Sequence, residues 1–310
     1  MIIYGPVPSR RLGRSLGINN IPPKICSYSC AYCQQGHSFK MQSERQLFYP
    51  ASQIFSEARI KVEQATADNE TIDYLSFVPD GEPTLDLALG EEIEMLKALG
   101  KVAVITNASL IWREDVRSEL GKADWVSLKV DAVDEDIWRR IDHPLKRLSL
   151  DSILDGILNF ADSFSGKLVT ETMLVKGIND SEECLNNIAS FLHKFTPSIA
   201  YLAIPTRPPA DKRVQAPDEY TINKAFQIFN SHISQTEYLI GYEGNDFSFS
   251  GDLEEDILSI TSVHPMREDA VQEFLDKSGA SWEAIKELIK EQKLLELSFQ
   301  GNKYYMRKLV

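Results

Sequence analysis

The feature that most constrains the fold is a regular alternation of strand and helix patterns between residues 51 and 241. Short apolar runs predict buried strands at 72–78, 101–106, 124–130, 167–175, 198–204 and 237–241. Apolar residues at helical spacing predict helices at 51–66, 87–99, 113–121, 134–141, 150–163, 181–194 and 218–234. Strands that alternate with helices of this length form right-handed β-α-β units and a parallel sheet. We therefore expect an α/β fold, a partial (β/α)6 barrel of the TIM type, because only about six such units fit.

The pattern changes after Gly251. Helices are predicted at 253–260, 267–277 and 281–292, and a hairpin at 294–299 and 303–307 around a turn at 300–302. Helices followed by a hairpin predict a winged-helix domain at 251–310, after a barrel domain at 1–250. Residues 252–310 hold twelve acidic and eight basic residues, a net charge of −4 that is unfavourable for nucleic acid. We expect this domain to dock a protein or peptide substrate in preference to DNA or RNA.

Three of the four cysteines, Cys26, Cys30 and Cys33, fall within eight residues in a C-x3-C-x2-C pattern. Three thiolates on one loop suit a soft metal centre. A four-iron cluster held by three cysteines keeps one iron open to a small molecule, which indicates catalysis. Two alternatives remain at this point: zinc bound by these cysteines and His37, or a disulfide with one spare thiol. The fourth cysteine, Cys184, lies in a predicted helix and is interpreted as a core thiol.

The cysteine spacing, with Tyr32 before the last cysteine, resembles that of the radical S-adenosylmethionine (SAM) superfamily. A second segment follows the strand predicted at 72–78, where the order Asp-Gly-Glu-Pro from Asp80 is similar to the Gly-Gly-Glu-Pro segment of that superfamily. Asp80 occupies the place of the first glycine. The resemblance implies a [4Fe-4S] cluster and SAM as cofactors. It implies cluster ligation by Cys26, Cys30 and Cys33, and SAM contacts by Tyr32, Gly81, Glu82 and Pro83.

Polar residues gather where the predicted strands end, and in parallel barrels the active site lies at the carboxyl ends of the strands. Asn107 follows the strand at 101–106 and could meet the ribose or carboxylate of SAM. Ser127, Lys129 and Asp131 alternate along the next strand and should share its interior face. This segment is similar to the Asp-x-Lys pattern of glycyl-radical activating enzymes, with serine replacing aspartate. The resemblance implies that Lys129 meets the SAM carboxylate and Ser127 its ribose or amino group; a structural Lys129–Asp131 ion pair is the alternative.

The last two strand ends supply further candidates. Glu171 should face the interior in phase with Met173, where a carboxylate would bind a cation, a substrate amine or SAM. Arg207 lies on a proline-rich segment at 204–209 and suits a substrate carboxylate or phosphate; capping of the loop against nearby acids is the alternative. Lys129, Glu171 and Arg207 are the candidate catalytic residues.

The chain opens with a dense basic cluster of Arg10, Arg11 and Arg14. Together with segments at 106–112, 174–180 and 205–210, this opening resembles the radical SAM group related to the wyosine tricyclic-base synthase. That synthase carries further cysteines for a second iron–sulfur cluster, which this sequence lacks. We therefore do not extend its tRNA substrate to this chain.

These motifs predict an enzyme that reductively cleaves SAM to a 5′-deoxyadenosyl radical, which abstracts hydrogen from an unknown substrate. The expected electron donor is a flavodoxin or ferredoxin. Two other functions stay open: a glycyl-radical activase acting on a partner protein, and a non-catalytic, metal-containing winged-helix regulator. The net charge of −13 and the absence of a membrane-length apolar run predict a cytoplasmic protein, and an oxygen-labile cluster implies anaerobic or micro-oxic life.

Overall fold

The computed structural model describes residues 2–240, 247, 249, 251–263, 265–299 and 301–308. Its main sheet consists of β1 (Ile3–Ser9), β2 (Gly13–Ile18), β5 (Tyr74–Phe77), β6 (Val102–Thr106), β7 (Trp125–Lys129), β8 (Lys167–Met173), β9 (Ile199–Ala203) and β10 (Thr236–Leu239), hydrogen-bonded in that order. β1 and β2 are antiparallel, and the other neighbouring pairs are parallel. The α/β class and the mostly parallel sheet are thus confirmed.

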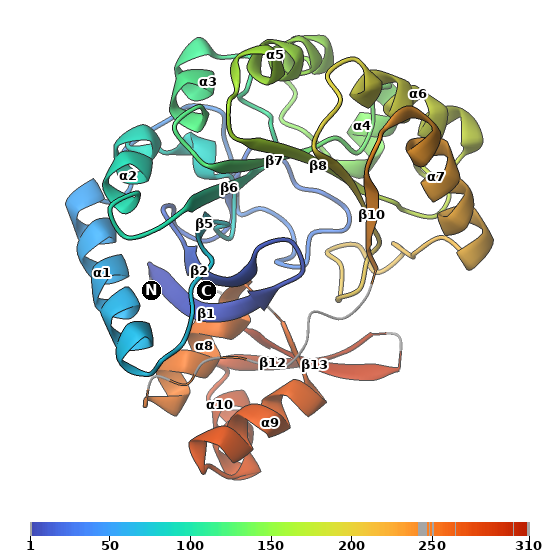
Figure 1. Cartoon of the computed structure of the whole chain (residues 1–310). Helices are drawn as coiled ribbons and strands as arrows, with labels where there is room; N and C mark the ends of the chain where they lie inside the picture. The colour runs from blue at the N-terminus through green and yellow to red at the C-terminus, as the bar shows by residue number, and fades with distance from the viewer. Residues whose placement is uncertain are drawn as a thin grey trace.

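Helices line the outer side of this curved sheet (Figure 1). They are α1 (Ala51–Ala67), α2 (Leu89–Leu96), α3 (Glu114–Leu120), α4 (Glu135–Ile141), α5 (Leu150–Ser163), α6 (Glu182–His193) and α7 (Glu219–His232). Four of them begin at a residue whose side chain accepts a hydrogen bond from a backbone N–H of the first turn: Asp134, Ser149, Ser181 and Asp218. All seven helices expected from the spacing are present. Among the described residues, no helix is both long and apolar enough to cross a membrane.

Residues alternate between the two faces of the sheet. Val104 and Leu128 belong to the cluster packed against the helices. Ala103, Trp125 and Val169 belong to a separate cluster on the inner face. The inner face therefore carries every second residue of each strand, as the sequence pattern predicts.

The hairpin of β1 and β2 was not expected from the sequence, because it carries glycines, prolines and arginines in place of alternating β-branched residues. Tyr4 holds it against the sheet. Its ring lies over Gly17, where a Cβ atom would stand 2.0 Å from the ring, and its hydroxyl donates to the carbonyl oxygen of Val78 at 3.3 Å. The tip of the hairpin carries Arg10 and Arg11 toward the carboxyl ends of the strands.

The chain after residue 250 forms α8 (Leu253–Val263), β11 (Met266–Arg267), α9 (Glu268–Ser278), α10 (Trp282–Lys290), β12 (Leu294–Phe299) and β13 (Asn302–Arg307). Its antiparallel sheet has the order β11-β13-β12. We call the described part of it, residues 251–263, 265–299 and 301–308, the C-terminal module. Its helices and hairpin are as expected, whereas β11 was not predicted.

Three expected positions lie outside the described residues: Gly241 of the last predicted strand, Ser250 at the predicted domain boundary and Gln300 of the predicted turn. The division of the chain at residue 250 stays a prediction.

Candidate functional site

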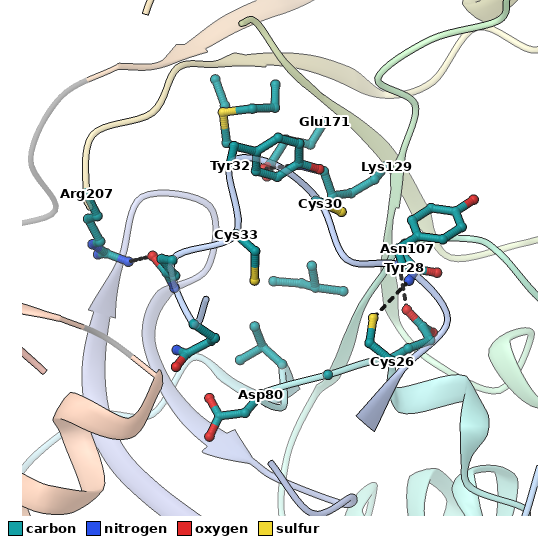
Figure 2. A pocket seen from close by; sticks show the side chains of 18 of the residues that line it. Cys26, Tyr28, Cys30, Tyr32, Cys33, Asp80, Asn107, Lys129, Glu171 and Arg207 are labelled. Carbon is teal, nitrogen blue, oxygen red and sulfur yellow. Dashed lines mark hydrogen bonds and ion pairs between the residues drawn. The ribbon is translucent and has the colours of Figure 1, made fainter. Parts of the chain in front are cut away.

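A cavity of about 290 Å³ opens at the carboxyl ends of the parallel strands (Figure 2). Its wall combines the cysteine loop, the tip of the β1–β2 hairpin and the segments that follow β5, β6 and β9. Side chains from the ends of β7 and β8 complete it. The cavity therefore lies at the carboxyl ends of the strands, where the sequence predicted the site.

The three clustered cysteines all line this cavity as free thiols (Figure 2). Cys26 lies on the short strand β3 (Ile25–Cys26), which pairs with β4 (Lys40–Met41). Burial raises the pKa of the Cys26 thiol to about 12, and burial likewise raises the pKa values of Cys30 and Cys33. Without a bound cation these thiols hold their protons, and a metal ion that bound them would displace the protons.

The zinc alternative receives no support from the geometry. His37 is exposed and is not part of the cavity wall. Within the described ranges, no three His, Cys, Asp or Glu side chains are close enough together to hold one ion. Three free thiols from one loop, spaced around a common cavity, are instead the donor set that a cluster with one open iron requires. The residues present therefore fit a [4Fe-4S] cluster.

Gly81 and Glu82 connect the cysteine loop to the sheet. A Cβ atom on Gly81 would stand 2.0 Å from the carbonyl oxygen of Ile25, beside Cys26, so this close approach requires glycine. The buried carboxylate of Glu82 accepts hydrogen bonds from Thr106 Oγ1 at 2.6 Å and from the Asn107 N–H at 2.8 Å. Glu82 thereby ties the end of β5 to the end of β6.

The other predicted residues of this region are placed as follows. Pro83 begins a 3₁₀ helix (Pro83–Leu85) and is buried away from the cavity wall. Asn107 lines the cavity, and its Nδ2 lies 3.0 Å from Ser27 Oγ and 3.5 Å from Cys26 Sγ. An amide at this position orients the cysteine loop and faces the space beside Cys26.

Lys129 and Glu171 face each other from neighbouring strands at paired register positions. Lys129 Nζ lies 3.1 Å from Glu171 Oε1 and 3.8 Å from Asp131 Oδ1, and 4.8 Å from the centre of the Tyr32 ring. Burial alone would lower the pKa of Lys129, but the carboxylates of Asp131 and Glu171 outweigh it and raise this pKa. The ammonium group of Lys129 therefore stands on the cavity wall beside two carboxylates that favour its charged form.

Glu171 also pairs with the guanidinium of Arg11 from the hairpin tip. Although burial opposes ionisation, the charges of Arg11 and Lys129 lower the pKa of Glu171 to about 2. The sequence pattern identified Arg11 as part of a basic cluster but did not place it in the site. Arg10 also lines the cavity, whereas Arg14 pairs with Glu70 at 3.3 Å and is not part of the wall.

A buried acidic group lies beneath Cys30. Asp142 Oδ1 accepts a hydrogen bond from the Cys30 thiol at 3.3 Å, and the Tyr32 hydroxyl donates to Asp131. Burial, reinforced by the charge of Asp131, raises the pKa of Asp142 well above its ordinary range. The sequence offered no signal for Asp142, because it follows α4 as an ordinary helix-ending residue and meets the cysteine loop only through the fold.

Asp80, the departure from the superfamily pattern, lines the cavity and is only 5% exposed. Its Oδ1 atom has no hydrogen-bond partner within the described residues. Burial raises the pKa of Asp80 to about 8, against the opposing charges of Arg307 and Lys24. A buried carboxyl oxygen without a partner beside a cavity is ready to accept a hydrogen bond from a ligand.

Arg207 and Ser127 complete the set of predicted site residues. Arg207 lines the cavity and donates to Gln34 Oε1 at 2.8 Å (Figure 2). Ser127 is fully buried on β7 and does not reach the cavity wall; its hydroxyl has no partner among the described residues. Cys184, as expected, is a buried core thiol of α6.

Comparison with known proteins gives one matching family model and a similar protein of nearly the same length. The family model of the radical SAM superfamily matches residues 20–188. The UPF0026 protein MJ1312 of Methanocaldococcus jannaschii is 48% identical over 311 residues, covering 99% of this chain and 96% of that protein.

Two solved structures share the fold. A radical SAM methyltransferase from Sphaerobacter thermophilus aligns with a TM-score of 0.57 and 16% identity, over 73% of this chain and 66% of that one. TYW1 with a lysine-pyruvate adduct bound aligns with a TM-score of 0.50 and 18% identity, over 71% of this chain and 74% of that one. At such identities the likeness concerns the fold alone.

Proposed function

Because this chain belongs to the radical SAM superfamily and to the UPF0026 family, we propose that it reductively cleaves SAM at a [4Fe-4S] cluster. The observation that carries this proposal is the set of three free thiols, Cys26, Cys30 and Cys33, on the wall of one cavity. When bound, the cluster and SAM supply a 5′-deoxyadenosyl radical that can abstract hydrogen from a substrate carbon.

The chain's own residues then place SAM and exclude water. Lys129 supplies a fixed positive charge for the SAM carboxylate, and the aromatic ring of Tyr32 next to it covers the lysine. Glu82 holds the ends of β5 and β6 in place, which sets where the backbone at Gly81 can meet the amino group of SAM. Burial of these groups supports a site from which solvent is excluded, as radical chemistry requires.

We propose that the substrate carries an anionic group, either a carboxylate or a phosphate. Arg10, Arg11 and Arg207 reach the cavity from two different segments, although the chain as a whole carries a net charge of −13. Guanidinium groups bind such anions in a bidentate manner. Arg10 and Arg207 bring guanidinium groups to the cavity wall from the hairpin tip and from the segment after β9.

We also propose a barrel and a winged-helix-like domain as the architecture of the chain. The helices along the outer side of the curved sheet support a partial (β/α)6 barrel. The order α8, β11, α9, α10, β12, β13, with β13 central in its sheet, supports a winged-helix-like domain after residue 250. We further propose a flavodoxin or ferredoxin as electron donor, and a cytoplasmic location, where free thiols persist.

The proposal is tested by anaerobic reconstitution with iron and sulfide, followed by incubation with SAM and dithionite. We expect a cluster absorption band in the visible range and formation of 5′-deoxyadenosine. Cys30→Ala should lower the iron content and reduce 5′-deoxyadenosine at least about 100-fold, whereas Cys184→Ala, the matched control, should retain both. Undiminished 5′-deoxyadenosine from Cys30→Ala would refute the assignment.

A further inference from the structure

Three segments that form the rim of the cavity also contact the C-terminal module. We call them the rim segments: the β1–β2 hairpin, residues 78–80 after β5, and residues 204–209 after β9. Each segment contributes side chains to the cavity wall, in addition to those of the cysteine loop and the interior strands. Their common neighbour is the C-terminal module.

The first contact is a shared apolar core. Tyr4 and Val7 of β1 are buried in one cluster with Ile257, Phe274 and other residues of the C-terminal module, and Val78 packs against the same cluster. The Tyr4 hydroxyl donates to the Val78 carbonyl oxygen within this contact. Two of the three rim segments are thereby packed against the module, β1 through buried side chains and residues 78–80 through the partly buried Val78.

The second contact holds the loop of Arg207. Tyr304 on β13 is 4% exposed, and its hydroxyl donates to the carbonyl oxygen of Thr206 at 3.0 Å. The next residue, Arg207, donates to Gln34 of the cysteine loop. β13 therefore fixes the backbone of the residue that precedes the rim guanidinium.

We propose that β13 of the C-terminal module supports the rim of the substrate site from outside the cavity, with Tyr304 as a positioning residue for Arg207. The inference rests on the proposed function, because it assigns the cavity rim to substrate. The module then sets the position of the loop that carries Arg207. It acts from a fixed position in the fold, and docking of a partner on its surface is not needed for this role.

Hydrogen exchange of the reconstituted holoprotein, followed by mass spectrometry, tests the positioning role. Tyr304→Phe removes the bond to Thr206 and should speed exchange of residues 204–209 roughly three- to tenfold, with the melting temperature nearly unchanged. Tyr305→Phe is the matched control, because the Tyr305 hydroxyl bonds to Glu296 inside the module. It should leave exchange of residues 204–209 as in the wild type. Equal exchange of this loop in both variants would overturn the inference.

Formation of 5′-deoxyadenosine by the wild type is measured in parallel. Its absence would refute the proposed function, whereas its presence with unchanged exchange in Tyr304→Phe would refute the positioning role alone.

Discussion

Gly81 shows how one residue can fix the geometry of the whole site. Its Cα lies so close to the cysteine loop that an added Cβ would stand 2.0 Å from the carbonyl oxygen of Ile25, a backbone atom that cannot rotate away. We expect Gly81→Ala to displace Cys26, lower the free energy of unfolding by about 2 kcal/mol and reduce cluster incorporation by more than half. Iron content and urea unfolding measure the two effects.

The control for this variant is Gly100→Ala. The nearest atom to its added Cβ is the side-chain Cδ1 of Leu75 at 3.0 Å, which can move by a rotamer adjustment. Full cluster incorporation in Gly81→Ala, equal to that of the control, would contradict the close-approach argument.

Asp80 predicts a pH dependence at the residue scale. Its native pKa of about 8 exceeds the ordinary value of 3.8, so the native apoprotein binds a proton that the unfolded chain has lost between these values. The protonated Asp80 carboxyl therefore contributes to the free energy of unfolding. This contribution is fully present below about pH 4 and is lost as pH rises through 8. Asp80→Asn removes this loss, so its stability relative to wild type should increase by about 4–5 kcal/mol between pH 4.5 and 8.5. Parallel urea-unfolding profiles for the two apoproteins over this range would disprove it.

At the scale of strands, the register of β7 and β8 brings Lys129 opposite Glu171, and the hairpin adds Arg11. Glu171→Gln would remove the buried carboxylate that Lys129 and Arg11 share, and should cost about 3 kcal/mol at pH 7. Because the native pKa of Glu171 is lowered to about 2, its contribution is present above the ordinary value of 4.5 and is lost as pH falls toward 2. The difference between variant and wild type should therefore shrink below pH 4.5.

Glu135→Gln serves as the control for this network. Glu135 pairs with Arg139 one turn along α4, with side-chain exposures of 48% and 41%. Such an exposed pair should change the free energy of unfolding by less than about 0.5 kcal/mol. Equal losses for the two variants in urea unfolding would show that burial adds nothing to the Glu171 network.

The strands and helices that could be predicted from the sequence are those with a clear local pattern. Strands such as residues 102–106 carry a continuous apolar run and helices such as α5 carry a Ser cap, so their local pattern determines their structure. The β1–β2 hairpin lacks this pattern, because Tyr4 is stabilised by Gly17 and Val78 from distant parts of the chain. The roles of Asp142 and Arg11 likewise arise from tertiary contacts that no local spacing records. Ser127, by contrast, has the predicted strand phase but lies too deep to reach the cavity.

For the whole molecule, the shared core of β1 and the C-terminal module implies that the two parts unfold together. Phe274 is 1% exposed at the centre of that core, so Phe274→Ala should cost about 3–5 kcal/mol. Tyr4, Val7 and Val78 couple the module to the sheet. In Phe274→Ala, the hydrogen-exchange rate of the slowest amides of β7 should therefore increase as much as that of the amides of α9. Tyr220→Ala, at a side chain that is 75% exposed, should change neither. Faster exchange confined to α9 would show that the module opens independently, and a module that opens on its own could not hold the rim of the cavity in place.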